Sequence, residues 1–442
     1  MTKKVLVLGL SKSGISAARF LKDSGYDVYL TESKSEVDSE KVKELQDYGI
    51  NVEYGVHSES FIENSQFAVA SPGIPPKSDI LKTLNAKKIP VIGEVELAYR
   101  NTEVPFIAIT GTNGKTTTTA LVSHILSKDF NAPVCGNIGI PPTELLKEEN
   151  DYFVCEISSY QAYMTKNFRP FISCWTNFTP DHIDWHEGLD NYFDAKAKIF
   201  KDEQAPEYAI LNGNDKKLAD FAENLKTSKV FLIGVKNTSN ACYIENDVIY
   251  YKSNKHNEEI ISIKDCPLVG NHNYENIMFA IVCAKLCNME TQTIADAIKT
   301  FKAPEHRLEK VREMDGITFY NDSKATNPEA SIVAIDSFNN LDVTLILGGR
   351  DKNTDLTQMC ESINKHVTTV ILIGEATERF EENLKKNGFN NIIKEDTLEN
   401  AIDKSINLKP DIVLLSPACA SFDMFKSYEH RGEVFKNYVL SK

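Results

Sequence analysis

The first 93 residues alternate between short apolar runs and amphipathic stretches. The segment KVLVLGLSKSGISAARFLKDSGYDVYLTES (4–33) predicts a buried strand, a glycine turn, a helix and a second strand. A further apolar run, QFAVA (66–70), leads into the loop SPGIPP (71–76). Because helices connect parallel strands in such alternations, the pattern predicts a Rossmann-like domain.

The same alternation continues through the rest of the chain. VPFIAIT (104–110) predicts a strand that enters a second glycine loop, and FKAPEHRLE (301–309), with its proline and charges, is typical of a linker. Beyond the linker, the apolar runs GITFYND, VTLILGG, TTVILIG and DIVLLSPA predict four buried strands. We therefore expect an α/β protein whose sheets are mostly parallel, with three domains at residues 1–93, 94–302 and 303–442.

The stretch NYFDAKAKIF (191–200) predicts a helix with a lysine on its apolar face. Four apolar side chains share that face: Tyr192, Phe193, Ile199 and Phe200. Lys196 lies four residues from both ends of this set and points to the same side, whereas Lys198 is expected to point to solvent. A lysine directed at a core is costly unless it is paired or chemically altered, so Lys196 is a candidate functional residue.

Composition and charge exclude several classes of function. The chain carries 49 Lys and Arg against 63 Asp and Glu, a formal net charge of −14, and has no Lys/Arg-rich run, so no nucleic acid is expected as a partner. No apolar run has membrane-spanning length, which favours a cytoplasmic protein that needs no membrane. The nine cysteines include no C-x-x-C pair, and Cys283 and Cys287 fit a buried apolar helix stripe.

The strongest motif is AITGTNGKTTTT (108–119). Gly111 and Gly114 form a turn between a strand and a helix that opens with Lys115 and Thr116. Backbone N–H groups at such a helix start bind phosphate, the lysine reaches the terminal phosphates, and the threonine hydroxyl is a ligand for Mg²⁺. Ile109 stands where the longest form of the motif has glycine, so this is a shorter variant. The middle domain is therefore expected to be P-loop ATPase-like and to bind ATP.

The glycine turn of the first domain is weaker evidence for a nucleotide. GLSKSG has Ser11 where a dinucleotide-binding turn has its second glycine, which disfavours NAD. Glu32, at the end of the second strand, is placed to bind a ribose hydroxyl. Two functions of the GLSKSG turn are compatible with this sequence: binding of a nucleotide of different geometry, and a purely structural role.

Acidic and basic residues follow the strands next to the phosphate loop. Glu156 ends the strand DYFVCE, and His182 follows the strand ISCWTN, with Lys196 fourteen residues later. An acid in that place commonly faces the Mg²⁺ of the loop threonine. A neutral, buried Lys196 can react with CO₂ to give an anionic carbamate that binds metal. A solvated Glu156, a structural His182 and a Lys196 paired with an acid are the alternatives.

Taken together, these segments resemble the Mur ligase superfamily of ATP-dependent amide-forming enzymes over the whole chain. The motifs that carry the resemblance occur in the family's order: GTNGKT, EISSYQ, TNFTPDHIDWH, AKAKIF, GNHNYEN, HRLE and NDSKATNP. The GLSKSG turn, the SPGIP loop, GGRDK and SPACASFDMFKSYEHRG resemble the members that add D-glutamate to UDP-N-acetylmuramoyl-L-alanine. The chain lacks the D-N-P-R motif expected of members that add diaminopimelate or lysine.

The resemblance implies a role for each matching residue. The catalytic set would be Lys115, Glu156, His182, Lys196 and Lys324. Two Mg²⁺ ions would be held by Thr116, Glu156, His182 and a CO₂-derived carbamate on Lys196. ATP would be bound by Gly111, Thr112, Asn113, Gly114, Lys115, Thr116, Thr117, Asn276, Arg307 and Asp322. The UDP-sugar would be bound by Ser11, Lys12, Ser13, Glu32, Ser33, Gly73, Asn137, Gln161 and His182, and the amino acid by Thr326, Lys352, Ser421, Phe422 and Tyr428, with Lys324 beside it.

The resemblance also implies a Rossmann-like C-terminal domain for the amino acid and a reaction through an acyl phosphate. The substrate carboxylate attacks the γ-phosphate of ATP, and the amine of the amino acid then displaces phosphate, in the cytoplasmic synthesis of peptidoglycan precursors. D-glutamate, rather than L-glutamate, rests on the resemblance alone, and a monomer is expected. The alternatives are another Mur-type or folylpolyglutamate-type ligase and, from a different class, a P-loop ATPase switch module.

Overall fold

The computed structural model describes residues 3–181, 183–254, 256–268, 270–302, 305–338, 340–351 and 354–442. Two compact units divide the chain: Met1–Cys266 with Glu275–Phe301, and Pro267–Tyr274 with Lys302–Lys442. The first unit contains two sheets and the second contains one. Within the described ranges, every helix is too short or too polar to cross a membrane.

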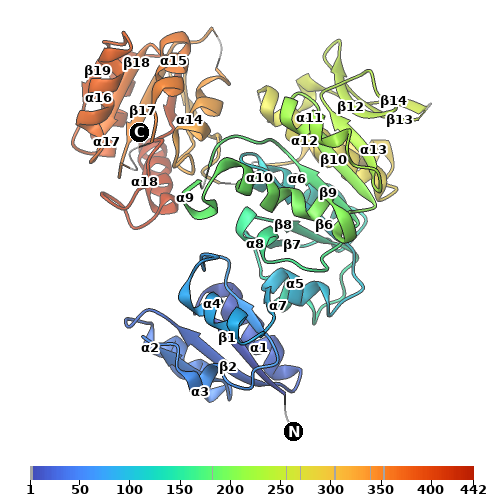
Figure 1. The fold of residues 1–442 in the computed structure, drawn as a ribbon. Helices are drawn as coiled ribbons and strands as arrows, with labels where there is room; N and C mark the ends of the chain where they lie inside the picture. The colour runs from blue at the N-terminus through green and yellow to red at the C-terminus, as the bar shows by residue number, and fades with distance from the viewer. Residues whose placement is uncertain are drawn as a thin grey trace. The chain divides into compact units, whose positions relative to one another are not determined.

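The first sheet is fully parallel and covered on both faces (blue in Figure 1). Its order is β3-β2-β1-β4-β5, from β1 (Lys4–Leu8), β2 (Asp27–Glu32), β3 (Asn51–Tyr54), β4 (Ala68–Ala70) and β5 (Val91–Gly93). Val5 and Val7 pack on one face, and Leu6 and Leu8 on the other, because successive side chains of a strand alternate. The helices are α1 (Lys12–Asp23), α2 (Ser39–Asp47), α3 (Glu59–Ile62), α4 (Asp79–Ala86) and α5 (Glu94–Tyr99).

The second sheet has nine strands in the order β14-β13-β12-β11-β10-β9-β6-β8-β7. The strands are β6 (Phe106–Thr110), β7 (Val134–Gly136), β8 (Phe153–Glu156), β9 (Ile172–Trp175), β10 (Tyr208–Asn212), β11 (Lys229–Ile233), β12 (Asn240–Glu245), β13 (Val248–Ser253) and β14 (His256–Ser262). The helices are α6 (Lys115–Leu126), α7 (Pro142–Leu145), α8 (Ser159–Tyr163), α9 (Ile183–His186), α10 (Leu189–Ala197), α11 (Lys216–Ala222), α12 (Asn271–Leu286) and α13 (Thr291–Lys299), with short 3₁₀ turns η1 (Lys198–Phe200), η2 (Asp202–Gln204) and η3 (Ile263–Asp265).

One end of this sheet is antiparallel, which the strand–helix alternation did not predict. β12 pairs with β13, and β13 with β14, in antiparallel register. Asn246 and Asp247, between β12 and β13, both have positive φ (50° and 62°). A two-residue turn of this kind matches the twist of a hairpin and favours Asn and Asp. The dipeptide Asn246–Asp247 is therefore a sequence signal for this hairpin.

The third sheet lies in the second unit (orange and red in Figure 1) and has the order β15-β16-β20-β17-β18-β19. Its strands are β15 (Glu309–Met314), β16 (Ile317–Asn321), β17 (Val343–Gly348), β18 (Thr369–Ile373), β19 (Ile392–Lys394) and β20 (Ile412–Leu415). Only β15 is antiparallel, through a turn at Asp315 and Gly316. The helices are α14 (Pro328–Ile335), α15 (Thr357–His366), α16 (Thr377–Lys386), α17 (Leu398–Leu408) and α18 (Tyr428–Ser441).

These sheets confirm the α/β class with mostly parallel strands and the four buried strands expected in the third block. The predicted domain boundaries at residues 93 and 302 stay predictions. Cys283, on α12, and Cys287, directly after its end, are buried free thiols, as predicted.

Candidate active site

The phosphate loop follows β6, which lies between β8 and β9 in the sheet. All three strands are parallel, and Ile109 of β6 is in register with Glu156, while Thr110 is in register with Trp175. The segments that follow these strands therefore meet at one edge, which is where ligands bind in parallel sheets.

The loop conformation depends on its two glycines. Gly111 and Gly114 have φ of 148° and 80°. A Cβ at Gly111 would lie 1.9 Å from Oγ1 of Thr176, and one at Gly114 would lie 2.6 Å from Oδ1 of Asn276. The loop is also held by Asn177, whose Oδ1 accepts a hydrogen bond from the Asn113 N–H at 2.8 Å. The loop is thus packed tightly against Thr176, Asn177 and Asn276.

The start of α6 fits a phosphate group. The helix begins after Gly114, which has no side chain to cap it, and N–H groups at a helix start are suited to bind phosphate. Lys115 bends back over the loop, and its Nζ donates to the carbonyl oxygens of Gly111 (3.0 Å) and Thr112 (2.7 Å). Thr116, Thr117 and the rest of the TTTT run form the first turns of α6, as predicted.

Glu156 is the acid next to this helix start. It is buried, and its Oε2 accepts a hydrogen bond from Oγ1 of Thr116 at 2.9 Å. Its Oε1 accepts from Nδ2 of Asn137 at 2.8 Å. A carboxylate paired with a hydroxyl at the end of the phosphate loop is a suitable donor set for Mg²⁺. Among the described residues no three His, Cys, Asp or Glu side chains form a metal cluster.

Lys196 is buried, as its position in the sequence predicted. Its side chain is 1 % exposed, its Nζ donates to the Gly111 carbonyl at 2.7 Å, and it lies 4.8 Å from the centre of the Tyr192 ring. Burial, and then the nearby charge of Lys115, lower the pKa of Lys196 well below its usual value. The structure thus places at the phosphate loop an amine whose neutral form is favoured.

The expectation that Lys198 points to solvent is wrong. Lys198 is half-buried, and its Nζ donates to the carbonyl oxygens of Tyr163 (2.8 Å) and Thr165 (2.6 Å) at the end of α8. The α-helix ends at Ala197, and Lys198 begins the 3₁₀ turn η1, whose tighter winding changes the direction of the side chain. The unpaired carbonyls at the end of a helix are natural partners for an ammonium group.

Two predicted site residues, His182 and Lys352, lie outside the described residues. The neighbouring Asp181 is described, and its charge acts to raise the pKa of Lys196. The helix that follows, α9, is joined to α8 by a hydrogen bond between Nε2 of His186 and Oγ of Ser159 at 2.9 Å.

Six of the residues expected to bind the UDP-sugar end or follow strands of the first sheet at its carboxyl edge: Ser11, Lys12, Ser13, Glu32, Ser33 and Gly73. Ser11 caps α1, and its Oγ lies 2.7 Å from Oγ of Ser71, so the glycine turn and the SPGIPP loop with Gly73 meet. Glu32 accepts hydrogen bonds from the backbone N–H groups of Leu10 and Lys34 and from Ser33. Burial acts to raise the pKa of Glu32, but these bonds outweigh it and lower the pKa.

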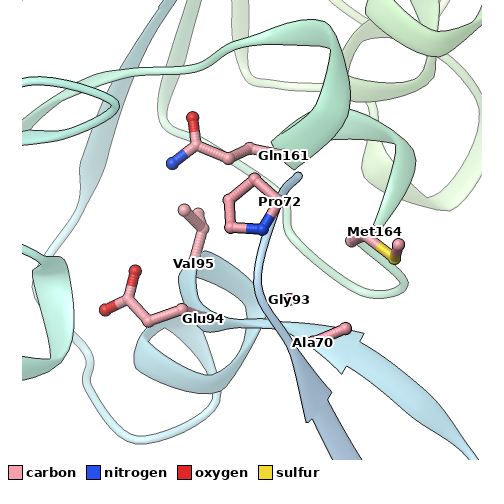
Figure 2. A pocket seen from close by; sticks show the side chains of 7 residues that line it. All are labelled: Ala70, Pro72, Gly93, Glu94, Val95, Gln161 and Met164. Carbon is pink, nitrogen blue, oxygen red and sulfur yellow. The ribbon is translucent and has the colours of Figure 1, made fainter. Parts of the chain in front are cut away.

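Lys12 reaches from α1 to the loop after β7, where its Nζ donates to the Gly139 carbonyl at 2.6 Å. Ser13 lies beside it in the first turn of α1. Gln161 accepts the Ser158 N–H in a capping box at the start of α8 and lines a small pocket, shown in Figure 2. The pocket is lined by Ala70, Pro72, Gly93, Glu94, Val95, Gln161 and Met164.

Glu94, beside this pocket, is linked through Thr143 of α7 to Ser16 of α1. Its Oε1 accepts hydrogen bonds from the backbone N–H (2.7 Å) and the hydroxyl (2.6 Å) of Thr143, which also lies 2.6 Å from Oγ of Ser16. The other oxygen, Oε2, is buried and has no partner among the described residues. Burial raises the pKa of Glu94 from 4.5 to about 7.

We expect this carboxyl group to make the first unit less stable at higher pH. The folded state keeps the proton between pH 4.5 and about 7 while the unfolded state releases it, so stability falls as pH rises through that window, by about 3 kcal/mol. In thermal unfolding, the free energy of unfolding of Glu94→Gln should therefore rise by about 3 kcal/mol relative to that of the wild type between about pH 5 and about pH 8. Glu36→Gln, at an exposed position before α2, is the control, and a stability gap independent of pH would contradict the prediction.

The expected ATP-site residues fall in both units. Asn276 packs on the phosphate loop and accepts a hydrogen bond from Oγ1 of Thr118 at 3.0 Å. In the second unit, Asp322 is buried and accepts hydrogen bonds from Ser416 (2.8 Å) and the Leu308 N–H (3.2 Å). Burial raises the pKa of Asp322 to about 7. Nε of Arg307 is buried and has no partner among the described residues, which fits a residue that awaits an anionic group.

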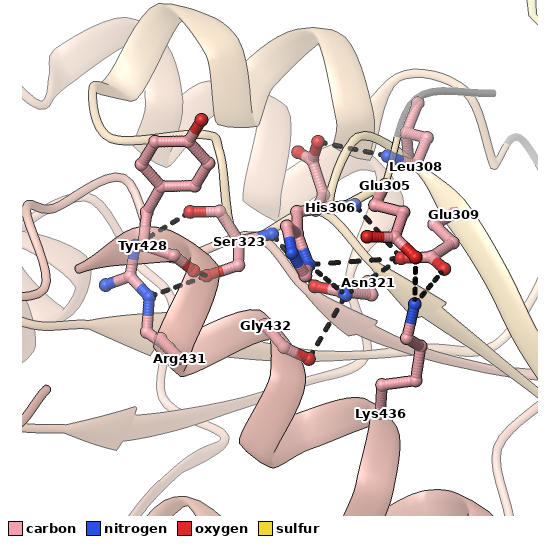
Figure 3. Close-up of polar contacts among 11 residues, drawn as sticks. Glu305, His306, Leu308, Glu309, Asn321, Ser323, Tyr428, Arg431, Gly432 and Lys436 are labelled. Carbon is pink, nitrogen blue, oxygen red and sulfur yellow. Dashed lines mark hydrogen bonds and ion pairs between the residues drawn. The ribbon is translucent and has the colours of Figure 1, made fainter. Parts of the chain in front are cut away.

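The residues that flank Arg307 in the chain are anchored to the third sheet and to α18. His306 is buried with a φ of 64°, and its Nδ1 lies 3.0 Å from Nδ2 of Asn321 (Figure 3). Nζ of Lys436, on α18, lies 2.9 Å from Oε1 of Glu305 and 2.8 Å from Oε1 of Glu309. The HRLE segment is therefore fixed to the third sheet and to α18.

Among the described residues expected around the amino acid, Lys324 and Thr326 follow β16, Ser421 and Phe422 follow β20, and Tyr428 begins α18. Nζ of Lys324 is 5.7 Å from the centre of the Tyr428 ring, and Thr326 follows on the same loop. Ser421 is buried, and its Oγ has no partner among the described residues, whereas Phe422 is 62 % exposed. The structure brings Lys324 close to Tyr428 and leaves the Phe422 ring in solvent.

Comparison with known proteins agrees with this architecture. Three family profiles match: the Mur ligase MurD-like N-terminal domain at residues 3–93, the Mur ligase middle domain at 109–284, and the Mur ligase glutamate ligase domain at 306–419. The MurF ligase of Acinetobacter baumannii shares the fold, with a TM-score of 0.64 and 17% identity over 99% of this chain and 93% of that chain.

Full-length relatives have higher identity. The chain is 40% identical to the UDP-N-acetylmuramoylalanine--D-glutamate ligase of Thermoanaerobacter pseudethanolicus, over 99% of this chain and 98% of the relative. It is also 40% identical to the ligase of the same name from Koribacter versatilis, over 99% of this chain and 97% of the relative. The chain therefore belongs to the Mur ligase family of ATP-dependent ligases and, within it, to the group of the UDP-N-acetylmuramoylalanine--D-glutamate ligases.

Proposed function

We propose that this enzyme joins D-glutamate to the carboxyl group of UDP-N-acetylmuramoyl-L-alanine and converts ATP to ADP and phosphate, as a step of peptidoglycan precursor synthesis. The observation that carries the proposal is the convergence on one phosphate loop of Lys115, the Thr116–Glu156 pair and the buried Lys196. A loop that only binds and hydrolyses ATP does not require a buried lysine beside it. The specific substrates follow from the relatives that share its full length.

Each residue of this edge has a task in acyl phosphate formation. Lys115 and the N–H groups at the start of α6 hold the terminal phosphates, so that the substrate carboxylate oxygen can attack the γ-phosphorus and ADP can leave. Thr116 and Glu156 would hold Mg²⁺, which supplies positive charge to the phosphate oxygens. The amine of D-glutamate then attacks the acyl carbon, loses a proton, and phosphate leaves with the former carboxylate oxygen.

Lys196 would take part as a carbamate. Its neutral amine attacks CO₂, a C–N bond forms, and one proton is released, which leaves an anionic group at the loop. The buried position and the lowered pKa of Lys196 favour the neutral amine that this reaction needs. The carbamate oxygens, with His182, would hold a second Mg²⁺ ion.

The remaining residues would bind the two organic substrates. The loops at the edge of the first sheet, with Asn137 and Gln161, would bind the UDP-sugar, and the loops of Lys324 and Ser421 would bind D-glutamate. We also propose that the enzyme acts as a monomer in the cytoplasm, where ATP and nucleotide sugars are available.

Phosphate release from ATP tests the proposal. The assay combines a panel of UDP-sugar acids with a panel of amino acids, including both enantiomers of glutamate. We expect turnover only when UDP-N-acetylmuramoyl-L-alanine and D-glutamate are both present. Turnover with a different amino acid would assign another ligase activity, and ATP hydrolysis that ignores both partners would support the switch module instead.

A further inference from the structure

Arg431 of α18 is a buried cation that the reaction described above does not use. Its side chain is 0 % exposed, and burial lowers the pKa of its guanidinium from 12.5 to about 10, so it stays charged at neutral pH. A buried charge is costly unless hydrogen bonds compensate for it. The contacts of this guanidinium therefore indicate why the fold retains it.

Those contacts join two loops, as Figure 3 shows in part. Nε donates to Oγ of Ser323 at 2.9 Å, and Nη2 donates to the Ser323 carbonyl at 2.8 Å. Nη2 also donates to the Cys419 carbonyl at 3.0 Å. Ser323 Oγ in turn donates to the carbonyl of Tyr428, the first residue of α18, at 2.8 Å.

The two loops follow neighbouring parallel strands. β16 and β20 are paired, with Asn321 in register with Leu415, so their loops leave the same edge of the sheet. Ser323 directly precedes Lys324, and Cys419 lies two residues before Ser421. The guanidinium thus fixes the spacing between residues that the proposed function assigns to the amino acid.

A third loop is packed against the same group. A Cβ at Gly349, which follows β17, would lie 3.1 Å from Nη1 of Arg431. Nη1 itself is buried and has no partner among the described residues. The planar guanidinium fills the space between three loops, which the single ammonium of a lysine cannot do.

We propose that Arg431 is a positioning residue of the amino-acid site, which holds the Lys324 loop and the Ser421 loop at the separation that the incoming amino acid requires. This inference rests on the proposed function for the identity of the substrate. Its structural part, the joining of the two loops, is independent of that identity.

The first measurement is steady-state kinetics of Arg431→Lys. We expect KM for D-glutamate to rise about 10- to 100-fold, because a small displacement of positioning groups has effects of that size. KM for UDP-N-acetylmuramoyl-L-alanine should change less than about threefold, since none of its described residues contacts Arg431, and KM for ATP should rise less than KM for D-glutamate, since among the ATP-site residues Asp322 alone adjoins Ser323. Equal changes for all three substrates would overturn the proposal, because a general loss of structure predicts that result.

Arg312→Lys is the matched control. Nη1 of Arg312 donates to the carbonyl oxygens of Val439 and Leu440 at the other end of α18, away from both loops. This variant should loosen the helix without raising KM for D-glutamate. If it raises KM as much as Arg431→Lys does, docking of α18 explains the effect and Arg431 has no special role.

Hydrogen exchange distinguishes this inference from the proposed function. In the full-length Arg431→Lys protein, amides of residues 322–327 and 416–421 should exchange faster than in the wild type, while those of the phosphate loop should not change. Wild-type turnover that fails with D-glutamate contradicts the proposed function alone. Unchanged exchange in both loops overturns the positioning role, whatever the substrate is.

Discussion

Replacing Lys196 by alanine should lower kcat/KM for ligation roughly a hundred- to a thousandfold, the effect of removing one preorganised charge-stabilising group. The side chain is buried against the phosphate loop, with Nζ bonded to the Gly111 carbonyl, so no other described lysine except Lys115 reaches this place. With ¹³C-labelled CO₂, the wild type should give a carbamate carbon signal by NMR, and Lys196→Ala should lack it.

The control for Lys196 must be an exposed lysine. Lys198→Ala is unsuitable because Lys198 is half-buried and bonded to the carbonyls of Tyr163 and Thr165, so its loss should reduce stability. Lys216, on α11, pairs only with Asp220 at the surface, and Lys216→Ala should leave both activity and signal unchanged. A carbamate signal that survives in Lys196→Ala would show that another amine carries it.

Glu156→Gln should lower kcat/KM at least about a hundredfold and raise the Mg²⁺ concentration for half-maximal activity about tenfold or more. The substitution keeps the shape of the side chain. Its amide oxygen can still accept from Asn137, and its NH₂ group can donate to the Thr116 hydroxyl, so the fold should persist. Only the negative charge is lost, and with it the affinity for a divalent cation.

A Mg²⁺ titration of activity, together with thermal unfolding, measures both effects. Glu144→Gln removes one carboxylate at an exposed position of α7 and should leave the titration unchanged. If Glu156→Gln loses activity that no concentration of Mg²⁺ restores, and unfolds at the wild-type temperature, the charge serves another step. An unchanged titration midpoint with full activity would contradict the metal role of Glu156.

Local patterns predicted the buried strands well. The run VTLILG is buried at every position of β17, because a strand covered on both faces needs a continuous apolar sequence. The hairpin of β12 and β13 was missed, although its turn at Asn246 and Asp247 is a recognised hairpin signal. Its strands mix polar and apolar residues, which a search for buried strands overlooks.

Lys196 and Lys198 mark the limit of helix periodicity. The spacing placed Lys196 correctly because α10 is regular up to Ala197. For Lys198 it was wrong, because the winding changes to 3₁₀ at that residue and because two carbonyl oxygens of another helix end lie within reach. Periodicity contains no information about either event.

The sequence by itself determined the order of strands and helices, the phosphate loop at Gly111–Lys115 and the burial of Lys196, since each depends on residues close together in the chain. The tertiary structure decided which polar groups meet: Glu156 with Thr116, and Arg431 with Ser323, 108 residues away. A hydrogen bond depends on the distance and direction between two groups in space, and strand order, not chain spacing, sets both.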